Sequence, residues 1–394
     1  MNWIHTIIAC SLCASAIAPS VAMSAATALP TDLSQQAKPA TIKVLVARQK
    51  DNVLLEVKGR YMVYDPVTGL EVGSGISTKR AQLIPCQEGL QWKELFPGIS
   101  QIRIMPGDSQ STILVDGIEY RGCVELYDVN GKLNVINEVD IERYLKSVMT
   151  TQFSQEYDEE VMEAVAIIAR TNAYFLVNRK PNAYYHVEAQ EVGYQGHALT
   201  LQNLHLDKAI NNTRHVVMTH KSQPFAATWT KDSAGKTADY AAIFRKAIST
   251  PHGVASPYAA HERSKHGWSF AVSKQELARV AGVGKVTAVE LYQDKNSEKV
   301  YGVRIKDEQK AHDIDFFKLQ NALGANRLRS NDFTIKLNGD QIVFNGFGEG
   351  HGVGLCLLGA LSMAEHGANT QKILATFFPD TKLENIRTFS SDAR

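Results

Sequence analysis

Apolar and polar positions alternate through the first third of the chain. In "NVLLEVKGRYMVYDPVTGLEV", which starts at Asn52, this alternation continues on both sides of a turn signal, Asp65-Pro66 to Gly69. Further on, "YRGCVELYDVNGKLNVIN" places Asn130-Gly131 between two alternating runs, a strong signal for a two-residue hairpin. Because a period of two predicts strands with one buried face, we expect an antiparallel, β-rich region over residues 42–137.

The period of the pattern changes at Asp158. From there, apolar residues recur at helical spacing: Val161, Met162, Val165, Ile168, Ala169 and Leu176. Asp158 can cap the first turn, the two glutamates that follow suit the helix dipole, and Pro181 comes after the end. The pattern predicts one long helix with a buried face.

Strand-like and helix-like segments then alternate to the end of the chain. We expect strands at residues 215–220, 224–230, 286–293, 299–306, 332–337 and 341–346, and helices at residues 273–282 and from about 357. The fold class that follows is α+β, with a β-rich N-terminal subdomain (about 42–137) continuous with a mixed α/β core (about 138–390).

The N-terminus predicts export. "MNWIHTIIACSLCASAIAPSVAMSAATALP" runs from apolar into small residues and has A-x-A-like sites near Ala16 and Ala22, so we interpret residues 1–24 as an export signal. "IIAC", ending at Cys10, is an alternative lipid-anchor site, and the apolar run is shorter than a membrane span requires. Residues 25–41 form a linker. We expect the mature protein in the periplasm or cell envelope.

Composition and charge exclude several function classes. The 394 residues carry 42 basic and 41 acidic side chains, a balance without the basic excess that nucleic-acid binding needs. "TKDSAGKT" resembles the end of a phosphate-binding loop, but Thr230 replaces its first glycine, so we expect no nucleotide. Beyond the signal, the odd number of cysteines argues against a disulfide framework; a Cys86–Cys123 pair and three separate thiols both stay open.

One glycine-rich stretch stands out, "FNGFGEGHGVGLC", in which glycines 346, 348, 350, 352 and 354 surround His351. Alternating glycine permits positive φ and lets another chain or a ligand approach the backbone closely. The stretch is either a packed strand-to-helix corner or a binding loop. The other histidines show no H-E-x-x-H or paired C-x-x-C spacing, and G-x-S-x-G is absent, so neither a metal site nor a nucleophile elbow is indicated.

Several ordered motifs together resemble one known family. They are "YRGCVEL", "LNVINEVDIERYLKSV", "EAVAIIARTNAY", "DSAGKTAD", "LGANRLRSNDFTI" and "GEGHGVGLCLLGALSMAEHGANTQKILATFFPDTKL". In this order they are similar to the SpoIID/LytB family, named for stage II sporulation protein D, over about residues 42–386. The resemblance implies a SpoIID-like catalytic core.

The resemblance also implies a function. Members of that family are exported and act on peptidoglycan. The sporulation members resemble lytic transglycosylases, which cut glycan strands stripped of their stem peptides and leave 1,6-anhydro ends, and the LytB members are named as enhancers of a cell-wall amidase. Transglycosylation needs one carboxylic acid, because the sugar's own 6-hydroxyl attacks the anomeric carbon.

The family's catalytic glutamate corresponds here to Gln152. Laid on the chain without a gap from Tyr144 to Thr171, the segment that starts at Val148 reads "VMTTQFSQEYDEE". An amide at residue 152 has no proton to give near neutral pH. We therefore expect a protein that recognises peptide-stripped glycan with transglycosylase activity weakened or lost. The alternatives are an active enzyme that uses another carboxylate, such as Glu156, and a scaffold that enhances a cell-wall amidase.

Other site residues follow from the resemblance in the same way. The loop with Gly350, His351 and Gly352 would line the glycan cleft, although Leu357 and Leu358 replace the glutamine and aromatic residue that usually follow it. Ser233 and Gly235 match a family turn, and Arg170 matches an A-R-T triplet. All six are expected to bind substrate. The zinc loop of some members has no cysteine here, so we expect no metal and no cofactor.

Overall fold

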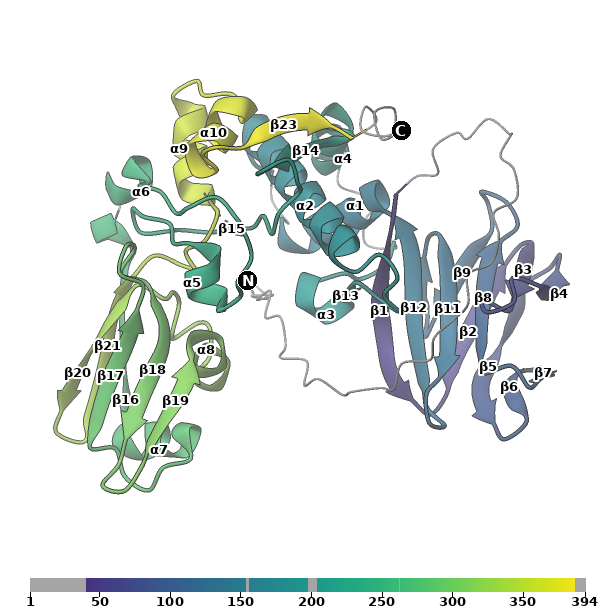
Figure 1. The fold of residues 1–394 in the computed structure, drawn as a ribbon, viewed down its shortest axis with the longest axis horizontal. Helices are drawn as coiled ribbons and strands as arrows, with labels where there is room; N and C mark the ends of the chain where they lie inside the picture. The colour runs from purple at the N-terminus through teal and green to yellow at the C-terminus, as the bar shows by residue number, and fades with distance from the viewer. Residues whose placement is uncertain (1–39, 154–155, 198–203, 262, 387–394) are drawn as a thin grey trace.

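A computed structural model describes residues 40–153, 156–197, 204–261 and 263–386. The predicted export signal lies outside these residues, as does all but the end of the predicted linker. Figure 1 shows strand-rich parts at the two ends of the molecule and most of the helices between them. The α+β prediction is confirmed. Among the described residues, no helix has both the length and the apolar character needed to cross a membrane.

The N-terminal part consists of two sheets that share one hydrophobic core. The seven-stranded sheet has the order β13 (Val187–Glu188), β1 (Thr41–Lys50), β12 (Leu133–Asp140), β11 (Cys123–Asp128), β8 (Gln101–Pro106), β3 (Tyr61–Tyr64), β4 (Glu71–Gly75). The six-stranded sheet has the order β10 (Ile118–Tyr120), β9 (Thr112–Val115), β2 (Val53–Lys58), β5 (Lys79–Cys86), β6 (Gly89–Trp92), β7 (Glu94–Pro97). The predicted Asn130-Gly131 turn joins β11 to β12.

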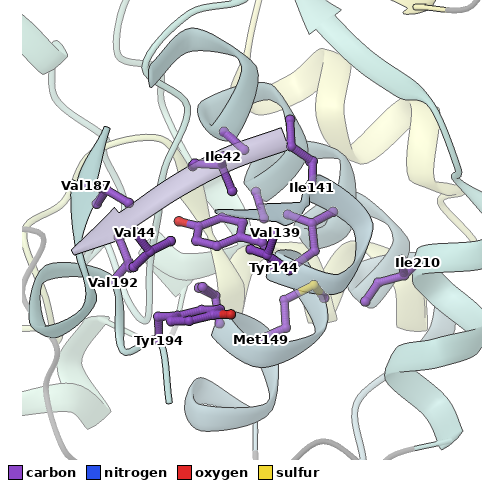
Figure 2. Packing of buried hydrophobic residues seen from close by; sticks show 14 of the residues in the cluster. Ile42, Val44, Val139, Ile141, Tyr144, Met149, Val187, Val192, Tyr194 and Ile210 are labelled. Carbon is purple, nitrogen blue, oxygen red and sulfur yellow. The ribbon is translucent and has the colours of Figure 1, made fainter. Parts of the chain in front are cut away.

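Helices continue the same core without a break. They are α1 (Ile141–Gln152), α2 (Glu159–Arg179), α3 (Ala189–Val192), α4 (Leu204–Asn212), α9 (Leu357–Glu365) and α10 (Thr370–Phe377). In Figure 2, Ile42 of β1, Val139 of β12 and Tyr144 of α1 converge on one apolar interior. The side chain of Asp158 accepts hydrogen bonds from the backbone N–H groups of Glu160 and Val161, so the predicted cap and the predicted long helix α2 are both confirmed.

Short elements connect this core to the rest of the chain. The strand β14 (Val216–Thr219) pairs with β23 (Lys382–Asn385), and β15 (Trp229–Thr230) pairs in parallel with β22 (Leu355–Cys356). The expected strand 224–230 is therefore a strand only at its last two residues. The helices α5 (Tyr240–Phe244) and α6 (Pro257–His261) follow β15.

Residues 267–347 form a separate lobe with its own hydrophobic cluster, which the sequence did not predict. One of its sheets has the order β16 (Gly267–Ser273), β21 (Gln341–Phe347), β20 (Phe333–Asn338), and the other has the order β17 (Ala288–Gln293), β18 (Val300–Lys306), β19 (Ala311–Asp315). Two helices, α7 (Lys274–Ala281) and α8 (Phe316–Leu323), complete the lobe. Its first and last residues, Gly267 and Phe347, are paired, so the chain enters and leaves through adjacent strands.

Candidate functional site

The glycine-rich loop packs against the protein's own chain, at residues 228–234. Gly348, Gly350, Gly352 and Gly354 all have positive φ. A Cβ on Gly348 would lie 2.6 Å from the carbonyl oxygen of Asp232, and one on Gly354 would lie 2.0 Å from that of Thr228. These contacts correct the expectation that approach of a sugar explains the glycines, because the neighbouring segment of the same protein already requires them.

His351 is held as a neutral imidazole at the centre of this loop. Its Nδ1 accepts a hydrogen bond from the backbone N–H of Val353 at 3.1 Å, which places the ring proton on Nε2. Nε2 lies 3.5 Å from the hydroxyl oxygen of Thr228. Burial lowers the pKa of His351 to about 4. Near neutral pH the ring therefore offers one N–H donor and no charge.

Two cationic side chains hold the carboxylate of Glu349, two residues before His351. Glu349 is 8% exposed, and its carboxylate accepts hydrogen bonds from Lys231, at 3.0 and 2.9 Å, and from Arg329, at 2.9 Å. Burial alone would raise the pKa of Glu349, but the hydrogen bonds from the two cations hold it below its ordinary value. Glu349 is thus ionised at neutral pH and is unsuited to act as a general acid there.

The lobe holds the other side of the loop. Asn331 donates a hydrogen bond from its amide to the carbonyl oxygen of His351 at 2.9 Å. Lys299, which is 1% exposed, donates to the carbonyl oxygen of Ser233 and to the carboxylate of Asp332, both at 2.7 Å. The conformation of the loop accordingly depends on residues that are 20 to 123 positions away in the chain.

Gln152 is the last residue of α1 and is partly buried. The next residue, Phe153, is buried, and its ring lies 5.9 Å from that of the half-buried Trp229. Trp229 directly follows Thr228, the residue that approaches His351. Trp229 therefore contacts the residue that follows α1, and Thr228 contacts the glycine loop. The end of α1 and the glycine loop, both identified in the sequence, thus lie close together.

Glu156 lies in a different environment from a typical catalytic acid. Its side chain is 67% exposed, and one of its carboxylate oxygens lies 3.1 Å from Nδ1 of His205, whose side chain is itself 59% exposed. Enzymes keep a carboxylic acid protonated near neutral pH mainly by burying it away from water and from cations. The side chain of Glu156 is mostly exposed to water, so it lacks this burial.

Arg170 has a structural role. Its side chain is completely buried and forms a bidentate pair with Glu142, at 2.9 and 2.8 Å. The same guanidinium donates to the carbonyl oxygens of Ile210 and Val216 and to the hydroxyl of Thr213. It ties α2 to α1 and to the end of α4, and no part of it reaches the surface, which corrects its expected place in a substrate-binding surface.

Ser233 and Gly235 lie on the segment that supports the loop. Ser233 is fully buried, and its backbone N–H donates to the sulfur of Cys356 at 3.2 Å. Burial raises the pKa of the Cys356 thiol, which therefore stays protonated. A Cβ on Gly235 would lie 2.9 Å from the Cα of Ala260. Both residues shape the turn from within, and Ser233 offers no surface to a ligand.

Cysteine pairing and metal binding can also be addressed for the described residues. The three cysteines Cys86, Cys123 and Cys356 are free thiols, so the open Cys86–Cys123 pairing is not formed. In the same part of the chain, no group of three or more His, Cys, Asp or Glu side chains lies close enough to hold a metal ion.

Sequence reasoning missed the aromatic residues around the loop. The ring of Phe244 in α5 lies 5.2 Å from that of His351 and is stacked on Tyr240 and Phe317, at 4.5 and 5.2 Å. The expected loss of stacking groups rested on Leu357 and Leu358, which follow the loop in sequence. Phe244, by contrast, is more than one hundred residues earlier, where no local pattern marks it.

Comparisons with known proteins agree with the resemblance seen in the sequence. Residues 129–220 match the model of the family described as SpoIID, stage II sporulation protein. An uncharacterized protein of Chlamydia pneumoniae is 34% identical over 45% of this chain and 65% of its own length. An uncharacterized protein of Brachyspira hyodysenteriae is 26% identical over 86% of this chain and 91% of its own length. Stage II sporulation protein D of Bacillus subtilis is 23% identical over 64% of this chain and 77% of its own length.

The matched region contains both Gln152 and Arg170. The matches to the Chlamydia pneumoniae protein and to an uncharacterized protein of Chlamydia muridarum cover slightly less than two thirds of those proteins, 65% and 62%.

Proposed function

Since the chain belongs to the SpoIID family, we propose that it is an exported protein that binds peptide-stripped glycan strands of peptidoglycan, with transglycosylase activity that is weakened or lost. Membership in this family suggests a role connected with the cell wall, and the Bacillus relatives are named for sporulation. Two further parts of the proposal rest on the residues of the site: that the ligand is a glycan strand, and that the protein binds this strand without cutting it.

The observation that carries the proposal is Gln152, the last residue of α1, which directly precedes the Phe153 that contacts Trp229. The family resemblance puts a glutamate there, and a glutamine keeps the shape and the hydrogen-bonding capacity of that side chain without its acidic proton. Sugar hydroxyls can still be bound by such an amide. Cleavage, however, loses its proton donor, a role worth roughly 10²–10⁴-fold in rate.

Glu156 and Glu349 both lack the properties of a replacement acid. Glu156 is mostly exposed, and Glu349 is clamped in its ionised form by two cations. These two observations favour the binding protein over the alternative of an active enzyme that uses Glu156 as its acid.

The test compares the purified mature protein with its Gln152→Glu variant on peptidoglycan stripped of stem peptides by an amidase. Pull-down measures binding, and release of 1,6-anhydro-ended fragments measures cleavage. We expect the native protein to bind without cutting and the variant to release anhydro ends, at a rate roughly 10²-fold or more above the native protein. Gln341→Glu, which adds the same charge at an exposed position of β21, is the matched control.

Anhydro ends released by the native protein would contradict the loss of activity, and Glu156→Ala would then be the next variant. Absence of pull-down for the native protein and for the variant would contradict glycan recognition itself.

A second candidate function is a scaffold that enhances a cell-wall amidase. Three large apolar side chains are strongly exposed between β3 and β5, namely Val67 at 73%, Leu70 at 66% and Ile76 at 83%. The strands β3 and β4, which adjoin these residues in sequence, lie at one end of the molecule, and β21, which leads into the glycine loop, lies at the other (Figure 1). Exposed apolar groups of this kind favour contact with another protein. If this is the function, replacing all three with serine should abolish stimulation of the amidase and leave glycan pull-down unchanged.

A further inference from the structure

A row of aromatic side chains leads from the glycine loop onto the lobe. It starts at Phe244, whose ring contacts that of His351 at 5.2 Å and is partly exposed. Phe244 and Tyr301 of β18 both pack against one small buried cluster that contains Val353, two residues after His351. The cluster joins the loop, α5 and the lobe sheet, and Figure 1 shows α5 beside the end of β18.

Two tyrosines of the lobe sheet extend this row. The rings of Tyr301 and Tyr292 are nearly parallel, with 8° between their planes and 5.9 Å between their centres. Tyr292 of β17 is paired with Gly302 of β18, and a Cβ on Gly302 would lie 3.4 Å from the ring of Tyr292. The ring therefore lies across the strand at a position without a side chain, and nothing from Gly302 covers it.

A guanidinium group lies over each of these two half-buried rings. The guanidinium carbon of Arg245 lies 4.7 Å from the ring centre of Tyr301, and that of Arg304 lies 5.3 Å from the ring centre of Tyr292. Arg304 is neutralised by Asp313, which accepts two hydrogen bonds from it at 2.7 and 2.8 Å. Arg245 is exposed. The surface thus presents two aromatic rings with one neutralised cation and one accessible cation.

We propose that Tyr292, Tyr301 and Arg245, here called the tyrosine platform, bind the glycan strand where it extends from the glycine loop onto the lobe. The proposal rests on the proposed function, because it assigns a further part of the same strand to this surface. Pyranose rings have apolar C–H faces that stack on aromatic rings, and their hydroxyls find partners at the polar edges of such a surface.

The platform also fits one chemical feature of peptide-stripped strands. Removal of the stem peptide leaves a free lactyl carboxylate on each muramic acid residue, so every disaccharide carries one negative charge. The guanidinium of Arg245 lies over the ring of Tyr301 and can pair with that carboxylate. The platform is therefore expected to prefer stripped strands over strands whose lactyl groups still bear peptides.

The experiment measures binding of the full mature protein and of Tyr301→Ala, Tyr301→Leu and Tyr292→Ala to amidase-stripped glycan strands. Loss of one stacking ring is expected to weaken binding about ten-fold. The leucine variant keeps apolar bulk against the buried cluster, so it separates loss of stacking from loss of folding, which thermal unfolding monitors. Tyr64→Ala, a half-buried tyrosine of β3 at the other end of the molecule, is the matched control.

A second arm uses Arg245→Gln with two ligands, stripped glycan strands and a chitin oligosaccharide that has no carboxylate. Binding of the stripped strands should weaken several-fold, while binding of the chitin oligosaccharide should not change. Native binding that survives undiminished in the folded tyrosine variants would overturn the platform and leave the proposed function intact. Failure of the native protein to bind stripped strands at all would overturn both.

Discussion

Replacing Arg170 with methionine is expected to destabilise the protein by about 3–5 kcal/mol, the usual cost of removing one partner of a buried ion pair. The magnitude follows from the contacts of the guanidinium. Without it, the carboxylate of Glu142, whose side chain is 10% exposed, loses two short hydrogen bonds, and the carbonyl oxygens of Ile210 and Val216 lose their donor. Each buried polar group left without a partner costs about 1–3 kcal/mol.

The assay is urea unfolding followed by circular dichroism, with glycan pull-down on the protein that remains folded. Arg80→Met, which removes a 63% exposed arginine from β5, is the control and should change stability little. The double variant Arg170→Met/Glu142→Leu should regain most of the lost stability, because it leaves no unpaired charge. A single variant of native stability that no longer bound glycan would refute the structural role and return Arg170 to the substrate surface.

Two further predictions concern the glycine loop. Gly354→Ala should destabilise the protein by about 2–4 kcal/mol in urea unfolding, because a Cβ there would lie 2.0 Å from a backbone oxygen at a φ of +78°. Gly339→Ala, at a φ of +57° with open space around it, should cost only about 1 kcal/mol, and equal costs would contradict the packing explanation. The low pKa of His351 predicts that the free energy of unfolding falls by about 2–3 kcal/mol as the pH drops from 6.5 to 4, because the unfolded chain takes up the proton first. His351→Gln should remove that part of the pH dependence, and an unchanged profile would show that burial does not hold the ring neutral.

Local sequence patterns predicted most of the individual elements. The two residues of the predicted turn, Asn130 and Gly131, have φ values of 56° and 75°, as a two-residue hairpin between twisted strands requires. The alternation that predicts strands records only which face of each strand is buried. It contains no information on which strand lies beside which, so the order of the sheets and the pairing of Gly267 with Phe347 were not accessible.

The site could be predicted only where its residues are neighbours in sequence. The glycine spacing indicated a close approach to the backbone, but the approaching group is residues 228–234 rather than a ligand. Arg170 was misassigned because a motif does not reveal burial, and its partner Glu142 lies 28 positions earlier. Phe244, Tyr292 and Tyr301 were missed because tertiary packing, and no local motif, brings them to the loop.

The attachment of the lobe has a consequence for how such proteins diversify. A segment whose two ends are adjacent can in principle be inserted into, or lost from, a host fold during evolution without disturbing it. This lobe is not independent of the rest of the protein. Its residues Lys299, Arg329 and Asn331 donate hydrogen bonds to Ser233, Glu349 and His351, respectively. Removing the lobe is therefore expected to leave the loop without these three hydrogen-bond partners, so the two are expected to be kept or lost together.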